Sequence, residues 1–218
     1  STNSLVGSTE NDGLSINYKP LANGNYVINL PNWDNGSVVD AGASIWGNGL
    51  TGVRGVISTS NSLVGSRSND NIGSNIVAFS NGNYVLTNYN WDNGTVVDGG
   101  AYTWVDGNRG ITGTITSANS LVGTTAKQFE SIQVTPLSNG NYLILAPKWD
   151  NGNLVDAGAV TFANGSQPIT GTISSANSLV GTTANQFSSV VAIALSNGNY
   201  VVYTPLWDSS TTVDVGAI

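Results

Sequence analysis

A Trp-Asp pair, followed by a second Asp, recurs four times in this sequence and supplies the residues best suited to chemistry. The four sets are Trp33, Asp34 and Asp40; Trp91, Asp92 and Asp98; Trp149, Asp150 and Asp156; and Trp207, Asp208 and Asp214. Two carboxylates flanking a turn could supply oxygen ligands to Ca²⁺, and an exposed indole could stack on a sugar ring. In the structural alternative, each Asp accepts hydrogen bonds from backbone N–H groups of its own turn, and the Trp fills the gap between neighbouring copies. We favour the structural alternative and keep all twelve residues as candidate ligand-binding positions.

Catalysis by these residues is disfavoured because the same groups recur in every copy, whereas an active site is normally single. Paired carboxylates could serve a glycosidase. The chain contains no His, Cys or Met, which excludes disulfides, imidazole or thiolate metal sites, and Ser-His or Cys-His catalytic pairs. It also lacks a P-loop, a dinucleotide-binding fingerprint and a nucleophile elbow. We therefore predict a protein that is not an enzyme and has no cofactor other than a candidate calcium ion at the Asp pairs.

The charge distribution limits the choice of partners and location. The net charge is −7, from 13 acidic and 6 basic residues, and eight of the acidic residues are the repeated Asp pairs. The chain has no basic patch for phosphates and no apolar run long enough to span a bilayer, so we expect neither nucleic-acid binding nor membrane insertion. A sparsely charged, Cys-free composition rich in Asn, Ser, Thr and Gly favours an extracellular or cell-surface location.

The repeat has a period of 58 residues. Asn-Ser-Leu-Val-Gly begins at Asn3, Asn61, Asn119 and Asn177. We therefore expect one repeat domain over residues 1–218, with copies at about 1–58, 59–116, 117–174 and 175–218, the last of them incomplete. In this pentapeptide, Leu and Val are expected to pack where one copy crosses to the next, while Asn and Gly set the turns. A ligand role for the pentapeptide is the less favoured alternative.

Each copy reads as four short strands, which in the third copy are expected at residues 132–137, 142–146, 156–162 and 169–173. Asn139-Gly140 is typical of a two-residue hairpin turn, because it supplies positive φ angles. Tyr142–Ala146 is apolar at successive positions, so both of its faces should be covered. No segment has the 3.6-residue apolar period of a helix, and the chain is predicted to be all-β.

A four-stranded sheet that is apolar on both faces must stack against other sheets. Radial stacking gives a β-propeller, whereas solenoid coils usually run to roughly 20–30 residues and a sandwich of this size would be thin. We therefore predict a β-propeller-type array of four 58-residue, four-stranded antiparallel blades, the last one incomplete. One chain could close a four-bladed ring, or two chains an eight-bladed one.

Residues 142–162, from Tyr-Leu-Ile-Leu-Ala-Pro-Lys-Trp-Asp to Gly-Ala-Val-Thr-Phe, resemble the FG-GAP repeat of integrin-α-type propellers. The whole unit, including Asn-Ser-Leu-Val-Gly, is similar to tandem repeats of bacterial, often cyanobacterial, filamentous-haemagglutinin-like surface proteins. The resemblance implies a propeller blade in a secreted or surface protein with a role in adhesion or assembly. The FG-GAP family often carries an Asp-rich calcium loop between its first two strands, but residues 138–141 are Ser-Asn-Gly-Asn, without a carboxylate.

Two classes of function follow. The first is a non-enzymatic module for adhesion or self-assembly, which belongs to a larger surface protein or closes through a partner chain. The incomplete fourth copy would leave an unpaired strand edge that another chain could complete by strand complementation. The second is a multivalent lectin with one Trp/Asp site per blade and glycans as partners. Burial of the four repeated indoles would exclude a lectin that binds sugars by stacking on these tryptophans.

Overall fold

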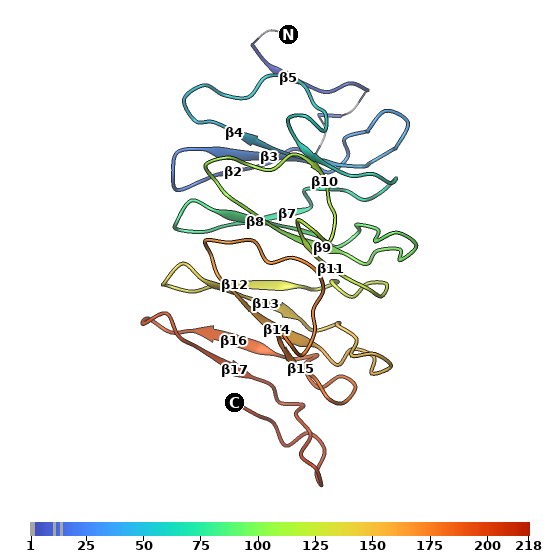
Figure 1. The fold of residues 1–218 in the computed structure, drawn as a ribbon, viewed down its shortest axis with the longest axis vertical. Helices are drawn as coiled ribbons and strands as arrows, with labels where there is room; N and C mark the ends of the chain where they lie inside the picture. Colours follow the sequence, from blue (N-terminus) through green and yellow to red (C-terminus); the bar gives the residue numbers. More distant parts are fainter. Residues whose placement is uncertain (1–2, 11, 14) are drawn as a thin grey trace.

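The chain folds into a row of small β-sheets stacked along one axis, with the two termini at opposite ends (Figure 1). The computed structural model describes residues 3–10, 12–13 and 15–218, and within these ranges it contains strands and turns but no helix. The strands are β1 (Leu5–Val6), β2 (Asn17–Pro20), β3 (Tyr26–Leu30), β4 (Ala43–Gly47), β5 (Gly55–Val56), β6 (Leu63–Val64), β7 (Asn75–Ala78), β8 (Tyr84–Asn88), β9 (Ala101–Val105), β10 (Gly113–Thr114), β11 (Leu121–Val122), β12 (Gln133–Pro136), β13 (Tyr142–Ala146), β14 (Ala159–Ala163), β15 (Leu179–Val180), β16 (Val191–Ala194) and β17 (Tyr200–Tyr203). The prediction of an all-β repeat is confirmed.

The three larger sheets are each built around a three-stranded antiparallel meander from one copy, whereas β1 pairs with β5 and β16 with β17 in sheets of two strands. In the third copy, β12 pairs with β13 and β13 with β14, with Ile144 opposite Val134 on one side and Thr161 on the other. All five residues of β13 are buried, as expected for a strand covered on both faces.

The next copy completes each sheet. β6, which belongs to the second pentapeptide, pairs antiparallel with β4 of the first copy, and β10 then adds to β6 in parallel. β11 and β15 join the second and third sheets in the same way. We call these sheets layer 1 (β2, β3, β4, β6, β10), layer 2 (β7, β8, β9, β11), layer 3 (β12–β15) and layer 4 (β16, β17). The expectation of four antiparallel strands from within one copy is therefore wrong, because the fourth segment pairs in parallel with a pentapeptide strand outside its own meander.

The described residues form an open row rather than a closed propeller. The pentapeptide strand joins the edge of the preceding sheet, while the hairpin that follows it packs flat on the face of that sheet. Each copy consequently advances the chain along one axis, and the first and last copies lie far apart (Figure 1). In the described part of the chain, no helix is long and apolar enough to cross a membrane.

The hydrophobic core lies between the layers. Phe79, Val85 and Trp104 of layer 2 pack with Tyr142 and Ile144 of layer 3 in one buried cluster. The rings of Phe79 and Tyr142 stack with centroids 4.8 Å apart. Two further clusters join layers 1 and 2 and layers 3 and 4, so most of the core depends on contacts between neighbouring layers.

The hairpin turns differ in detail from the prediction. The N–H of Leu137 donates to the carbonyl of Asn141 at 2.8 Å, which leaves a three-residue loop instead of a two-residue one. Gly140 alone in this loop has a positive φ, 84°. A three-residue hairpin loop requires the left-handed conformation only at its last position, where Gly is favoured. The Asn before it is therefore free for another role.

Candidate functional site

The two Asp residues of each copy are joined by a hydrogen bond that closes their loop. Oδ1 of the first Asp accepts from the backbone N–H of the second at 2.8 to 2.9 Å in all four copies. The second Asp has a φ of 51 to 54° in every copy. Asp tolerates this left-handed conformation better than most residues, which explains its recurrence there. The structural interpretation of the pairs is thus supported by geometry in each copy.

The other oxygen of the first Asp is also engaged in three copies. Oδ2 of Asp150 accepts from the Thr125 hydroxyl at 2.6 Å, and Asp208 accepts from Thr183 at 2.7 Å. The first copy has a longer contact, 3.3 Å, from Thr9 to Asp34. These bonds hold the loop against the segment that follows the pentapeptide.

Three of the four tryptophans of the motif are buried. Trp33, Trp91 and Trp149 are 2%, 5% and 6% exposed, and Trp149 lies in the cluster that contains Ile144 and Ile173. Trp207, in layer 4, is partly exposed and packs on Phe187 with ring centroids 5.7 Å apart. Three of the four copies consequently offer no indole face to a sugar, and the packing interpretation of this Trp is confirmed for them.

Sequence reasoning missed a hydrogen-bonded junction between layers. The Nδ2 groups of Asn23 and Asn25 and the Nε1 group of Trp46 all donate to the carbonyl oxygen of Gly107, at 2.9, 2.9 and 2.8 Å. Asn81, Asn83 and Trp104 make the same contacts to Gly165 of the next layer. Both Asn residues of Asn-Gly-Asn recur in every copy, although only the first precedes the turn glycine. The recurrence of the second Asn was the feature of the sequence that could have indicated this junction.

Trp46 and Trp104 therefore have a polar role at this junction. The equivalent residue of the third copy, Phe162, has no N–H to donate and instead stacks on Tyr200 of the next layer, with ring centroids 6.1 Å apart. An aromatic contact thus takes the place of this hydrogen bond in the third copy.

The pentapeptide acts as a structural junction, as expected. Oδ1 of Asn119 accepts from the N–H of Thr116 at 2.9 Å, and its Nδ2 donates to the carbonyl of Thr114 at 2.9 Å. Leu121 is fully buried, and a Cβ on Gly123 would lie 1.9 Å from the carbonyl oxygen of Gly99 in the preceding copy. Only glycine permits this approach of the two backbones.

A further polar position, also missed from sequence, lies in the loop after the pentapeptide. It is Asp12 and Asp70 in the first two copies and Gln128 and Gln186 in the last two, and all four are buried. Oδ2 of Asp70 accepts from the N–H groups of Ser66 and Arg67, both at 2.8 Å. Because Gln128 accepts from the N–H of Thr124 at 2.6 Å, the position requires an acceptor and not a charge.

The two buried carboxylates at this position differ in acidity. Burial raises the pKa of Asp70, and this effect outweighs the hydrogen bonds from Asp92, Ser66 and Arg67 that lower it. At Asp12 burial also acts to raise the pKa, but the bonds from the Thr9 hydroxyl and from backbone N–H groups together lower it. Folding thus shifts the protonation equilibrium toward the neutral acid at Asp70 and toward the carboxylate at Asp12.

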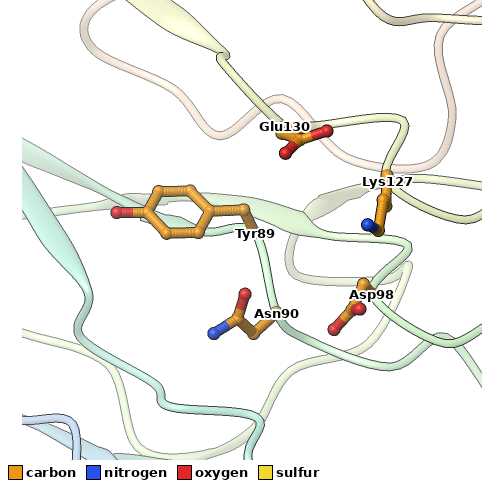
Figure 2. A pocket seen from close by; sticks show the side chains of 5 residues that line it. All are labelled: Tyr89, Asn90, Asp98, Lys127 and Glu130. Atoms are coloured by element: carbon orange, nitrogen blue, oxygen red, sulfur yellow. The ribbon is translucent and has the colours of Figure 1, made fainter.

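A shallow hollow of about 190 Å³ lies beside one of the repeated Asp residues. Figure 2 shows Asp98, Lys127 and Glu130 around it, with the ring of Tyr89 extending away from Lys127. Lys127 is Asn in the second and fourth copies, and Glu130 is Ile or Ser there, so the charges belong to this copy alone. Lys127 and Glu130 are exposed, and the hollow has neither the repetition of a multivalent site nor the enclosure of a catalytic one.

The remaining electrostatic contacts are few. Lys148 forms an ion pair with Asp156 at 3.0 Å in the third copy. Hydrogen bonds from the N–H of Asp214 and from the Thr183 hydroxyl lower the pKa of Asp208. Across the residues whose placement is described, three or more acidic side chains do not gather in a group that could hold a metal ion.

The sequence was compared with known families and curated proteins. A family described as a repeat of unknown function, DUF5650, matches residues 1–16, 20–74, 78–131, 136–189 and 194–218. The chain belongs to this family of tandem repeats. Each central match begins at the last residue of one hairpin's first strand and ends after the next pentapeptide, so it covers the second and third strands of a layer and the strand that completes that layer. No curated protein matches the sequence.

Proposed function

We propose that this DUF5650 chain is a non-enzymatic repeat module of an extracellular or cell-surface protein, with a role in adhesion or self-assembly. One observation carries the proposal: the recurring polar and aromatic side chains are used to join copies. The Asn-Gly-Asn amides donate to the next layer, the paired Asp residues close their own loops, and three of the four motif tryptophans are buried. Because these amides, carboxylates and indoles already take part in contacts within the stack, they favour a structural role over substrate chemistry.

Other features favour an exposed structural role. The charge is low apart from the Asp pairs, and the chain contains no Cys. The resemblance to bacterial surface repeats points the same way. The lectin alternative loses support, because stacking on a sugar needs an exposed indole and Trp33, Trp91 and Trp149 do not provide one.

Self-association is tested with beads that carry the chain at high density. We expect coated beads to cluster in buffer that contains chelator and no sugar, whereas albumin-coated beads stay dispersed. Retention of coated beads on a surface bearing the same chain provides a second readout. If the beads neither cluster nor adhere, the proposed function is wrong for this chain.

Calcium is not required by the proposal. Each first Asp already accepts a backbone N–H, so we expect chelator to shift the melting temperature by less than about 1 °C. A ligand that binds only the folded state would raise the melting temperature by an amount that grows with its concentration relative to its Kd. Scanning calorimetry with millimolar calcium and with chelator measures this, and a clear rise with calcium would assign the Asp pairs to metal binding.

A further inference from the structure

Asn-Gly pairs are the feature of this chain most open to spontaneous modification. In such a pair, the backbone nitrogen of Gly can attack the side-chain amide of Asn, because Gly has no side chain to obstruct the approach. Asn is accordingly among the thermolabile residues. The Gly nitrogen loses its proton in this reaction, so a hydrogen bond donated by that N–H opposes it. The chain contains nine such pairs, which begin at Asn23, Asn35, Asn48, Asn81, Asn93, Asn139, Asn151, Asn164 and Asn197.

Six of the nine pairs hold the Gly N–H in a hydrogen bond. In the four hairpin loops, this N–H donates to the backbone carbonyl three residues earlier, at 3.1, 3.1, 3.0 and 3.1 Å, from Gly24, Gly82, Gly140 and Gly198. Two more pairs follow the third strand of a layer. Their glycines, Gly49 and Gly165, donate to Oδ1 of an asparagine in the same layer, at 3.0 and 3.2 Å. The fold therefore opposes the reaction at these six pairs.

The three pairs of the Trp-Asp-Asn-Gly motif differ. In the described part of the chain, the N–H groups of Gly36, Gly94 and Gly152 donate no hydrogen bond, and all three glycines are exposed. Each glycine lies in a two-residue turn whose ends are bonded. In the third copy, Asn151 and Leu154 exchange both backbone hydrogen bonds, at 3.0 and 3.1 Å. The turn is held at its ends, while its glycine nitrogen is open to reaction.

We propose that Asn35, Asn93 and Asn151 are sites of deamidation, which loosens the contact between consecutive copies. The Gly nitrogen forms a bond to Cγ of Asn, the Cγ–Nδ2 bond breaks, and the proton of the Gly nitrogen leaves with ammonia. Water then opens the cyclic imide at either of its carbonyl groups, which gives Asp or isoaspartate. Water is the only other reactant. The proposal does not depend on a role in adhesion or self-assembly.

The amide that is lost is one that joins two copies. Nδ2 of each of these three Asn residues donates to the carbonyl oxygen of the pentapeptide glycine in the next copy, at 3.2, 2.8 and 2.8 Å. An Asp at the same position presents a carboxylate oxygen to this carbonyl oxygen, so a donor–acceptor pair becomes a pair of acceptors. Isoaspartate also adds a methylene group to the backbone of a tight turn. Both products therefore weaken the junction between layers.

The hydrogen-bond lengths predict an order of reaction. The amide of Asn35 is held at 3.2 Å, at the long end of the range for N–H···O bonds, whereas Asn93 and Asn151 are held at 2.8 Å. Since the amide must leave its acceptor to meet the Gly nitrogen, Asn35 should react first. The fourth copy has Ser209-Ser210 in place of Asn-Gly and lacks the reacting pair.

Peptide mapping by mass spectrometry tests the assignment of the sites on the full chain. Folded protein is aged in mildly alkaline buffer, and a sample unfolded in urea is the matched control, because it contains the same pairs without the fold. In the folded protein, the three motif pairs should react at least about tenfold faster than the other six, as the loss of one hydrogen bond allows. In urea the rates should be similar. Equal rates at all nine pairs of the folded protein would overturn the proposal.

Asn151→Asp tests the effect of the product. It should lower the folding equilibrium constant at least about tenfold, and further than Asn151→Ala, because a carboxylate then faces the carbonyl of Gly181. Asn164→Asp is the matched control. Oδ1 of Asn164 accepts from the N–H of Ser166 at 2.8 Å, a bond that Asp retains, and its Nδ2 donates to none of the described residues. This variant should be as stable as the wild type. An Asn151→Asp variant with wild-type stability would show that deamidation does not loosen the stack.

A variant without the reacting pairs connects the reaction to its effect. Asn35→Ser, Asn93→Ser and Asn151→Ser are combined to copy Ser209 of the fourth copy. Aged wild-type protein should unfold at progressively lower urea concentrations as the three sites react, whereas the unfolding midpoint of the triple variant should not change with age. An equal decline in both proteins would refute the assignment of the loss to these three sites.

Discussion

Layers 3 and 4 have closely related sequences but different environments. Tyr142 is fully buried in layer 3, whereas Tyr200, its counterpart in layer 4, is 38% exposed. The leucines of the third and fourth pentapeptides, at the edges of layers 2 and 3, differ in the same way: Leu121 is fully buried and Leu179 is 50% exposed. The pentapeptide itself is identical in the two copies, so the difference comes from the neighbours and not from the repeat.

The comparison shows that each layer depends on the next copy for part of its stability. Leu121 is enclosed by the segment around Gly171, which pairs beside it, and by the face of layer 3. Repeat arrays of this kind derive their stability from each unit and from its contacts with the next. Equivalent substitutions should therefore have unequal effects in the two layers.

The largest difference is expected for the motif tryptophans. Trp149→Ala removes a buried indole and should cost about 3–5 kcal/mol of unfolding free energy. Trp207→Ala should cost less than half of that, because Trp207 is partly exposed. Urea denaturation followed by circular dichroism measures both. Equal losses would contradict a dependence of burial on the following copy.

The pentapeptide leucines provide a second matched pair. Leu121→Ala should cost about 2–5 kcal/mol and leave a cavity between layers 2 and 3. For Leu179→Ala we expect a loss below about 1.5 kcal/mol, since half of the side chain is already exposed. Hydrogen exchange can localise each effect, with faster exchange expected in β13 for the first variant and little change there for the second.

The asparagine that joins two copies should have a smaller effect. Asn151→Ala removes the 2.8 Å bond to the carbonyl of Gly181 and should cost about 1–2 kcal/mol. Urea denaturation followed by circular dichroism measures the loss. An Asn151→Ala variant as stable as the wild type would contradict a role of this bond in joining the two copies.

The smallest effect is expected at the buried acceptor position and depends on pH. Because the folded-state pKa of Asp70 is raised, its contribution to stability is present below the unfolded pKa of about 3.9 and is lost as pH rises through the folded value. Asp70→Gln, which copies Gln128, should therefore raise stability at pH 7 by less than about 1 kcal/mol and have little effect at pH 3.

Asp12 provides the control of opposite sign. Its folded-state pKa is lowered, so its contribution is present above the unfolded pKa and is lost as pH falls through the folded value. Asp12→Asn should accordingly lower stability at pH 7 and have less effect at pH 3. Urea denaturation at the two pH values compares the variants, and effects of the same sign would contradict the difference between the two carboxylates.

Several features could be predicted from the sequence because they depend on residues close together in the chain. The second strand of the third copy was predicted at residues 142–146, which are the bounds of β13. The structural interpretation of the Asp pairs also rested on local chemistry, since Asp150 and Asp156 close a loop of their own. The all-β class and the positions of the turns depended on apolar alternation and glycine positions within one copy, and the period required only a comparison of the copies.

The tertiary structure alone decided how the copies meet. The sequence pattern marks Leu121 and Val122 as an apolar pair, but it does not say that they complete the sheet of the preceding copy. The sequence reasoning predicted that the apolar sheets stack around a ring, but the described residues form a row, which buries the same faces. The choice depends on close approaches between distant residues, such as the backbones of Gly123 and Gly99 and the amide of Asn23 near Gly107. Those approaches are absent from any single copy and form only when one copy lies on the next.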